Sequence, residues 1–100
     1  MARLLFAPAA ARDLAKISDD IATAAGERVA LSFVGRLRRS LESLPEFPRM
    51  GRRRPSFGPG VRSWALTPYV VFYRQLGSDV EIIRVVHGRR RLTRSLLRGD

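Results

Sequence analysis

The chain has 100 residues, a usual size for one domain, and 45% of them are hydrophobic, which is enough to build one core. Its net charge of +10 favours nucleic acid or acidic protein partners, and 12 of the 19 basic side chains lie in residues 49–100. Its lack of cysteine excludes disulfides, thiolate metal sites and cysteine nucleophiles and fits the cytoplasm, and its apolar runs are too short for a signal peptide or a membrane span.

The first half of the chain predicts a short strand followed by two helices. Residues 3–6 are typical of a strand, and Pro8 suits the first turn of a helix because no N–H is needed there. Apolar residues then recur every three or four positions up to Gly26, and again from there to Pro45. Two amphipathic helices separated by one glycine predict an antiparallel helical hairpin.

The second half of the chain predicts a loop followed by a sheet. Residues 45–60 are rich in proline, glycine and arginine, which predicts a long, flexible connection. β-Branched and aromatic residues dominate 61–66, 69–76 and 80–87, and the short turns between these segments predict an antiparallel meander. Residues 90–98 have leucines spaced for a brief terminal helix.

These elements predict an α+β fold in a single domain over residues 1–100. A short N-terminal strand and an antiparallel helical hairpin precede three strands, and the hairpin packs on one face of an antiparallel sheet. Apolar residues such as Ile82 and Ile83 occupy both faces of the last strand, so the second face also needs a cover. The terminal leucines or a partner protein would supply that cover, and the sequence leaves both open.

No sequence pattern predicts a cofactor or a metal site. The chain has no His/Cys cluster and no Gly-rich phosphate loop, and His87 is its single histidine. A single histidine at a strand end is more often a packed, hydrogen-bonded residue than a catalyst. Arg84, Arg89, Arg90 and Arg91 are its basic neighbours, but strand alternation places Arg84 and His87 on opposite faces unless a bulge intervenes.

Several segments of the chain, taken together, resemble the ParE/RelE toxin superfamily. They are Val61-Arg62-Ser63-Trp64, Tyr69-Val70-Val71-Phe72-Tyr73-Arg74 and Val80-Glu81-Ile82-Ile83-Arg84-Val85-Val86-His87-Gly88, with a similar first helix at Ala11–Ile17 and a similar connector at Pro48–Arg52. The resemblance covers most of the chain. It implies a RelE/ParE-like fold and the toxin of a bacterial type II toxin–antitoxin system, which a cognate, ParD-like antitoxin neutralises.

The superfamily has two functional branches. RelE-like members cut messenger RNA on the ribosome, and the residues matching such a nuclease would be Arg62, Arg84 and His87. No tyrosine or histidine follows His87, however, and His87-Gly88 followed by arginine resembles the ParE-like ending. That branch is associated with inhibition of DNA gyrase by binding. We therefore predict a non-enzymatic gyrase inhibitor, with an endoribonuclease and an inactive or purely protein-binding relative as the alternatives.

The resemblance also predicts two sets of binding residues. The predicted target-binding residues are Arg84, His87, Arg89, Arg90 and Arg91. The predicted antitoxin-binding residues are Leu37, Trp64, Tyr73 and Arg62, with Phe33 as a further anchor, although the aromatic and leucine side chains among them also suit an ordinary core. Nucleic acid is expected only as an indirect partner, through the gyrase–DNA complex, and no membrane partner is expected.

Overall fold

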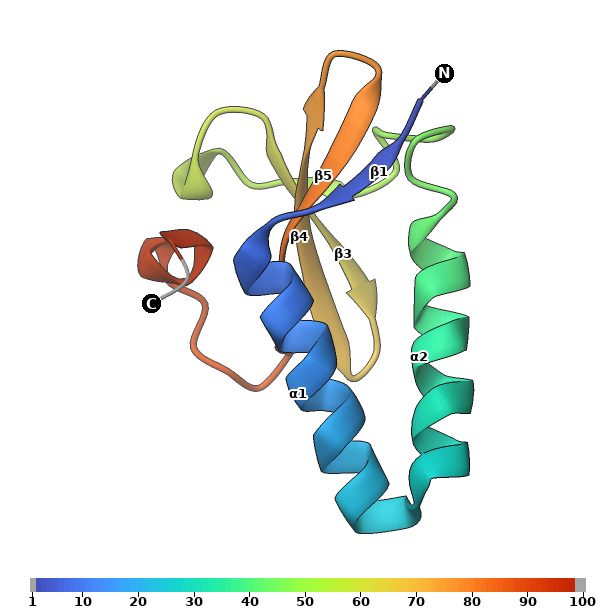
Figure 1. Ribbon diagram of the computed structural model, residues 1–100. Helices are drawn as coiled ribbons and strands as arrows, with labels where there is room; N and C mark the ends of the chain where they lie inside the picture. Colours follow the sequence, from blue (N-terminus) through green and yellow to red (C-terminus); the bar gives the residue numbers. More distant parts are fainter. Residues whose placement is uncertain (1, 99–100) are drawn as a thin grey trace.

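The computed structural model describes residues 2–98, in which two helices pack against a five-stranded sheet (Figure 1). In chain order the elements are β1 (Leu4–Phe6), α1 (Pro8–Ala25), α2 (Glu27–Leu41), β2 (Arg52–Arg53), the 3₁₀ helix η1 (Pro55–Phe57), β3 (Val61–Leu66), β4 (Tyr69–Leu76), β5 (Asp79–His87) and the 3₁₀ helix η2 (Arg94–Arg98). The strands lie in the order β1-β5-β4-β3-β2. The predicted α+β fold is therefore confirmed.

The helical hairpin forms where the two apolar stripes predict it. Helix α1 begins at Pro8, and Gly26, with φ of 96°, separates it from α2. Glycine suits this position because a side chain would be strained at such a φ. Helix α2 ends at Leu41 and not at Pro45, because 3₁₀-type hydrogen bonds, such as that from Leu44 N to Leu41 O at 3.0 Å, tighten the chain there.

Strands β3, β4 and β5 form the predicted antiparallel meander, but the complete sheet is mixed. Strand β1 runs parallel to β5, with Phe6 opposite Ile82. This pairing joins segments far apart in the sequence, so turn patterns do not predict it. The short strand β2 adds to the other edge, where Arg52 pairs with Ser63, although the sequence predicted only a loop there.

Strand β5 contains a bulge at Ile83, between the positions that pair with Phe72 and Tyr73. The extra residue shifts the alternation by one, so Val85 lies on the same, helix-facing side as Val80 and Ile82. Since the bulge precedes Arg84, the side chains of Arg84 and His87 remain on opposite faces, as strand alternation predicts.

The second face of the sheet, opposite the helices, is covered by the chain itself. Its apolar residues are Val61, Phe72 and Val86, against which Phe57, Leu92 and Leu97 pack. The sequence left open whether the terminal leucines or a partner protein cover this face. The terminal leucines lie on it, together with Phe57 of η1. The terminal helix is a 3₁₀ helix that starts at Arg94, and not the helix predicted over 90–98, because so few residues do not nucleate a stable α-helix.

The connector, residues 45–60, is held against the sheet and is not the flexible arm that the sequence predicted. The buried Tyr73 hydroxyl accepts a hydrogen bond from Gly51 N at 2.8 Å and donates one to Pro48 O at 2.9 Å. Arg62 Nη1 donates to Gly51 O at 2.9 Å. Burial raises the pKa of Tyr73, so its hydroxyl stays protonated and able to donate.

Candidate functional site

Strand β5 ends in an exposed basic turn that runs from His87 to Arg91. Arg89 N donates to His87 Nδ1 at 3.0 Å, and the imidazole packs edge-on against Tyr69 with ring centroids 5.7 Å apart. Arg89, Arg90 and Arg91 are exposed, and no ion pair found in residues 2–98 includes them. The structure thus brings four of the five predicted target-binding residues into one solvent-facing segment.

The fifth predicted target-binding residue, Arg84, lies elsewhere and has a different environment. It is only 6% exposed and forms two hydrogen bonds to the Asp13 carboxylate, from Nε at 2.7 Å and from Nη2 at 2.8 Å. Its Nη1 donates to Leu96 O at 2.6 Å. The hydrogen bonds to Asp13 raise the pKa of Arg84 against the opposing effect of burial. In this conformation Arg84 joins α1, β5 and the terminal segment and is not offered to a target.

Asp13 is the partner that sequence patterns missed. Strand β1 pairs with β5 only as far as Ile82, so the edge of β5 beyond that point has no neighbouring strand in the described chain. The Asp13 carboxylate lies there and accepts a hydrogen bond from Val85 N at 2.9 Å as well as those from Arg84. In the sequence, Asp13 is one of several polar residues beside the apolar stripe of the first helix. Nothing in that pattern predicts a contact between Asp13 and Arg84.

The three residues that would match a nuclease are not brought together. Arg62 and His87 lie at opposite ends of the sheet. Leu66 pairs with Tyr69 of β4, which pairs with His87 of β5, and Arg62 lies about 13 Å along β3 from Leu66. Arg84 is on the opposite face from His87 and is bonded to Asp13. General acid–base chemistry needs groups within hydrogen-bond reach of one reacting centre. These three side chains do not form such a centre.

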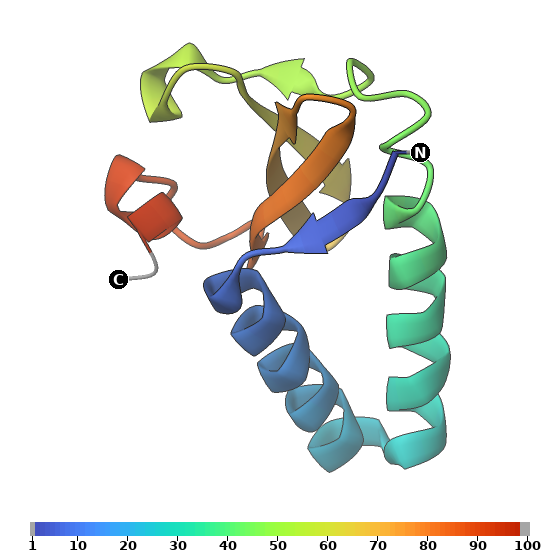
Figure 2. The ribbon, with the colours of Figure 1, turned by 45° about the horizontal axis from the view of Figure 1, so that its top comes forward.

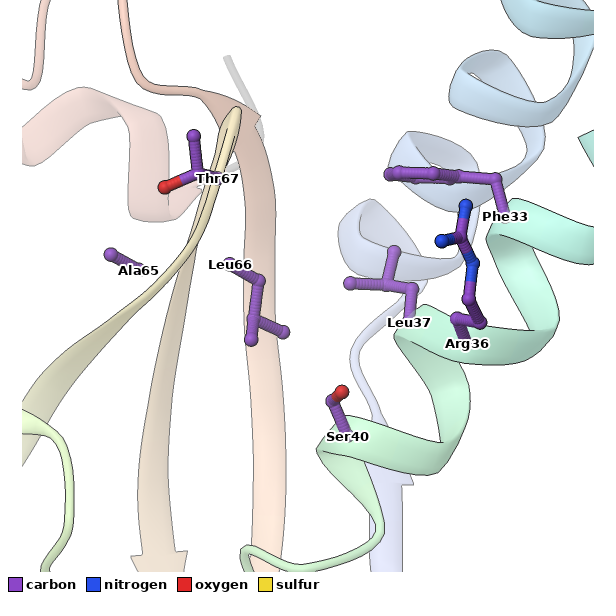
Figure 3. Close-up of a pocket in the computed structure, with 7 residues that line it drawn as sticks. All are labelled: Phe33, Arg36, Leu37, Ser40, Ala65, Leu66 and Thr67. Carbon is purple, nitrogen blue, oxygen red and sulfur yellow. The ribbon is translucent and has the colours of Figure 1, made fainter.

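The predicted antitoxin-binding residues fall into two places. Leu37 is only 5% exposed and belongs to the main core, although it forms the floor of a groove of about 500 Å³ between α2 and the end of β3, which Phe33 also lines (Figure 3). Trp64 is half-buried against the main core. Tyr73 is fully buried and Arg62 is half-buried, and both hold the connector instead of lining the groove.

The groove contains further residues that the sequence could have predicted. Helix α2 contributes Phe33, Arg36, Leu37 and Ser40, and β3 with its following turn contributes Ala65, Leu66 and Thr67. In Figure 3 Phe33 and Leu37 project from the helix toward the strand. The four helix residues recur at the three- and four-residue spacing of one helical face, so the sequence pattern predicts that they lie together. The pattern does not predict which edge of that face remains accessible in the folded protein.

The described residues offer little for other chemistries. Residues 2–98 contain no cluster of three His, Cys, Asp or Glu side chains that could hold a metal ion. Within the same part of the chain, no helix combines the length and the apolar character needed to cross a membrane. The exposed chemistry is therefore cationic at the basic turn and mixed apolar and cationic in the groove, which suits binding to macromolecules.

Known proteins share the sequence and the fold of this chain. Residues 4–92 match the family described as the ParE toxin of the type II toxin–antitoxin system parDE. The chain is 33% identical to Toxin ParE3 of Caulobacter vibrioides over 96% of both chains, and 30% identical to Toxin ParE1 of Mycobacterium tuberculosis over 94% of this chain and 97% of that one. A solved structure titled "Chromosomal ParDE TA system from P. aeruginosa" matches with a TM-score of 0.75 and 30% identity, over 87% of this chain and 96% of that one. The chain thus belongs to the ParE toxin family of type II toxin–antitoxin systems.

Proposed function

We propose that this ParE toxin inhibits DNA gyrase by binding it through the basic turn and that a cognate, ParD-like antitoxin neutralises it. The observation that carries the proposal is the turn itself, where three exposed arginines follow an exposed histidine. Exposed charge without carboxylate partners raises the rate of association with a target that carries DNA. Because gyrase works on chromosomal DNA, the proposed place of action is the cytoplasm.

The proposed antitoxin site is the groove between α2 and β3. Its half-buried apolar residues, Phe33 and Leu66, suit the apolar face of an antitoxin segment, and Arg36 at its rim suits an acidic side chain. The net charge of +10 also favours an acidic partner. The P. aeruginosa structure, whose title names a ParDE system, supports an antitoxin of the ParD kind for this chain.

Reversing the charge of Arg36 should weaken antitoxin binding about tenfold, equivalent to ~1.4 kcal/mol. Arg36 is exposed and lines the groove, with its Cζ 5.9 Å from the centre of the Phe33 ring. The measurement is titration calorimetry of Arg36→Glu with the antitoxin encoded by the adjoining reading frame. Arg28→Glu, which is exposed at the start of the same helix, is the matched control. Equal losses in both variants would place the antitoxin outside the groove.

Removing two arginines of the basic turn should weaken gyrase inhibition about tenfold or more without changing stability. Arg89 and Arg90 have exposed side chains, and the backbone hydrogen bonds of the turn do not depend on them. The measurement is the toxin concentration that halves DNA supercoiling, for wild type and for Arg89→Ala/Arg90→Ala. Arg12→Ala/Arg28→Ala removes the same charge from exposed helix positions. If both double variants inhibit as well as wild type, the basic turn does not bind the target.

Messenger RNA cleavage on translating ribosomes distinguishes the alternative activity. The separation of Arg62, Arg84 and His87 favours binding over a nuclease reaction, so we expect intact messages after incubation with purified toxin. Cleaved messages that disappear with His87→Ala would establish the endoribonuclease instead. A folded toxin that affects neither gyrase nor ribosomes would leave only the protein-binding role.

A further inference from the structure

A second cationic surface lies on the connector, at the other end of the sheet from the basic turn. We define the connector arginine surface as Arg49 and Arg53 of the connector together with Arg62 of the adjoining strand β3, because these three arginines line one cavity. In Figure 2 the connector, in yellow-green, runs over the end of the sheet farthest from the turn between α1 and α2. Part of this surface is hollowed, because Arg49, Arg53, Pro55, Gly60, Val61 and Arg62 line a cavity of about 310 Å³.

Hydrogen bonds to the sheet hold this surface in place. Arg54 Nε donates to Ser63 Oγ at 2.8 Å, and Arg54 N donates to Val61 O at 2.8 Å. Arg62 Nη1 donates to the carbonyl oxygens of Gly51, at 2.9 Å, and Arg49, at 3.3 Å. The connector is thus held against the sheet, and Arg62 is fixed through its own guanidinium group, which lowers the entropy lost when the surface binds an anion.

Protein carboxylates leave this positive charge uncompensated. The ion pairs of residues 2–98 join Arg3 to Asp79, Lys16 to Asp20, Arg74 to Glu81 and Arg84 to Asp13, and none includes the connector arginine surface. The acidic residue closest in sequence, Glu46, lines a separate hollow with Leu4 and Glu42. Three arginines that line one cavity without an acidic partner favour an external polyanion.

We infer that the connector arginine surface binds the phosphate backbone of duplex DNA without reading its sequence. Guanidinium groups form bidentate hydrogen bonds with phosphate oxygens, and contacts of this kind position a protein on DNA. The cavity has no aromatic lining residue on which an unpaired base could stack, whereas single-strand binders commonly use such residues.

This DNA contact does not require gyrase, although its biological use rests on the proposed function. The basic turn lies at the His87 end of β5, whereas the connector arginine surface lies at the Arg62 end of β3. The two cationic surfaces can therefore engage different partners at the same time. The toxin would hold the DNA with one surface and gyrase with the other.

Fluorescence anisotropy with a short labelled duplex of mixed sequence tests the inference. We expect Arg49→Ala/Arg53→Ala to weaken binding at least about tenfold at ~0.1 M salt and to reduce the salt slope by about 2. Both side chains are exposed and donate no hydrogen bond to any group within residues 2–98, so thermal unfolding should be unchanged. The control Arg12→Ala/Arg28→Ala, which has the same net charge, should stay within about threefold of wild type.

Three results would overturn the inference. The first is equal weakening by both double variants, which would indicate general charge attraction. The second is tighter binding to the single strand than to the duplex. The third is a loss of affinity for the antitoxin with unchanged affinity for DNA, which would assign the surface to an acidic protein. DNA binding that persists while supercoiling is unaffected would sink the proposed function and leave this inference standing.

Discussion

Replacing Asp13 by alanine should lower the free energy of unfolding by about 3–5 kcal/mol, because the substitution leaves the charge of Arg84 buried without its partner. The Asp13 and Arg84 side chains are only 14% and 7% exposed, so water cannot replace the lost carboxylate easily. The same substitution removes the acceptor for Val85 N. Urea unfolding followed by the fluorescence of Trp64, the single tryptophan, measures the change.

Two further variants separate a buried ion pair from a general effect of mutation. Asp19→Ala removes an exposed carboxylate from the same helix and should change stability by less than about 0.5 kcal/mol. Asp13→Leu/Arg84→Met replaces both charges and should recover much of the stability lost in Asp13→Ala. A loss of less than about 1 kcal/mol in Asp13→Ala would contradict the role assigned to the pair.

Adding one methyl group at Gly51 should destabilise the protein by about 1–3 kcal/mol, because the site has no room for it. A Cβ atom there would lie 2.7 Å from Tyr73 Cε1 and 2.8 Å from Ser63 O. Tyr73 and the backbone of β3 are fixed in the sheet, so the connector would have to move away. Thermal unfolding of Gly51→Ala gives the loss.

Gly35→Ala provides the matched control, because a Cβ there would meet only the flexible end of Arg39 at 3.5 Å. Within α2 this change should be neutral or stabilising by up to about 1 kcal/mol. Tyr73→Phe, which leaves Gly51 N without its acceptor, should cost about 1–3 kcal/mol. If Gly51→Ala behaves like Gly35→Ala, the connector is not anchored as the structure has it.

The anchored connector and the buried pair connect the fold to the proposed functions. Tyr73 fixes Gly51, and Gly51 lies beside the arginines of the connector arginine surface. Arg84 bonds Leu96 and so fixes the segment that follows the basic turn. The sequence suggested Tyr73 and Arg84 as direct binding residues. In the structure Tyr73 instead supports the connector arginine surface, and Arg84 supports the segment that follows the basic turn. Their substitution would change binding through stability as well as through contact.

Local patterns predicted the helices and the meander correctly because those elements depend on neighbouring residues. The stripes on either side of Gly26 and the β-branched segments after Gly60 each follow one period. The parallel pairing of Phe6 with Ile82 depends on where the hairpin returns the chain, which no local period encodes. Strand β2 was missed for the same reason, because Arg52 pairs with Ser63 across a loop.

The candidate site was predictable where exposure follows from chain position and unpredictable where it depends on long-range contacts. The basic run after His87 stands at a strand end, and the structure leaves it exposed. Arg84 has the same charge, but it is buried and bonded to Asp13, which is distant in the sequence. Tyr73 reads as a surface anchor in a strand, yet its hydroxyl holds the connector. Sequence periodicity cannot distinguish such paired charges and hydroxyls from free ones.

The most direct test of the central claim is DNA supercoiling by purified gyrase, titrated first with the toxin and then with the antitoxin encoded beside it. We predict that supercoiling falls with toxin concentration and returns when an equimolar amount of antitoxin is added. Full supercoiling at saturating, folded toxin would contradict the claim that the basic turn acts on gyrase. Inhibition that the antitoxin does not reverse would contradict the claim that the groove is the neutralising site.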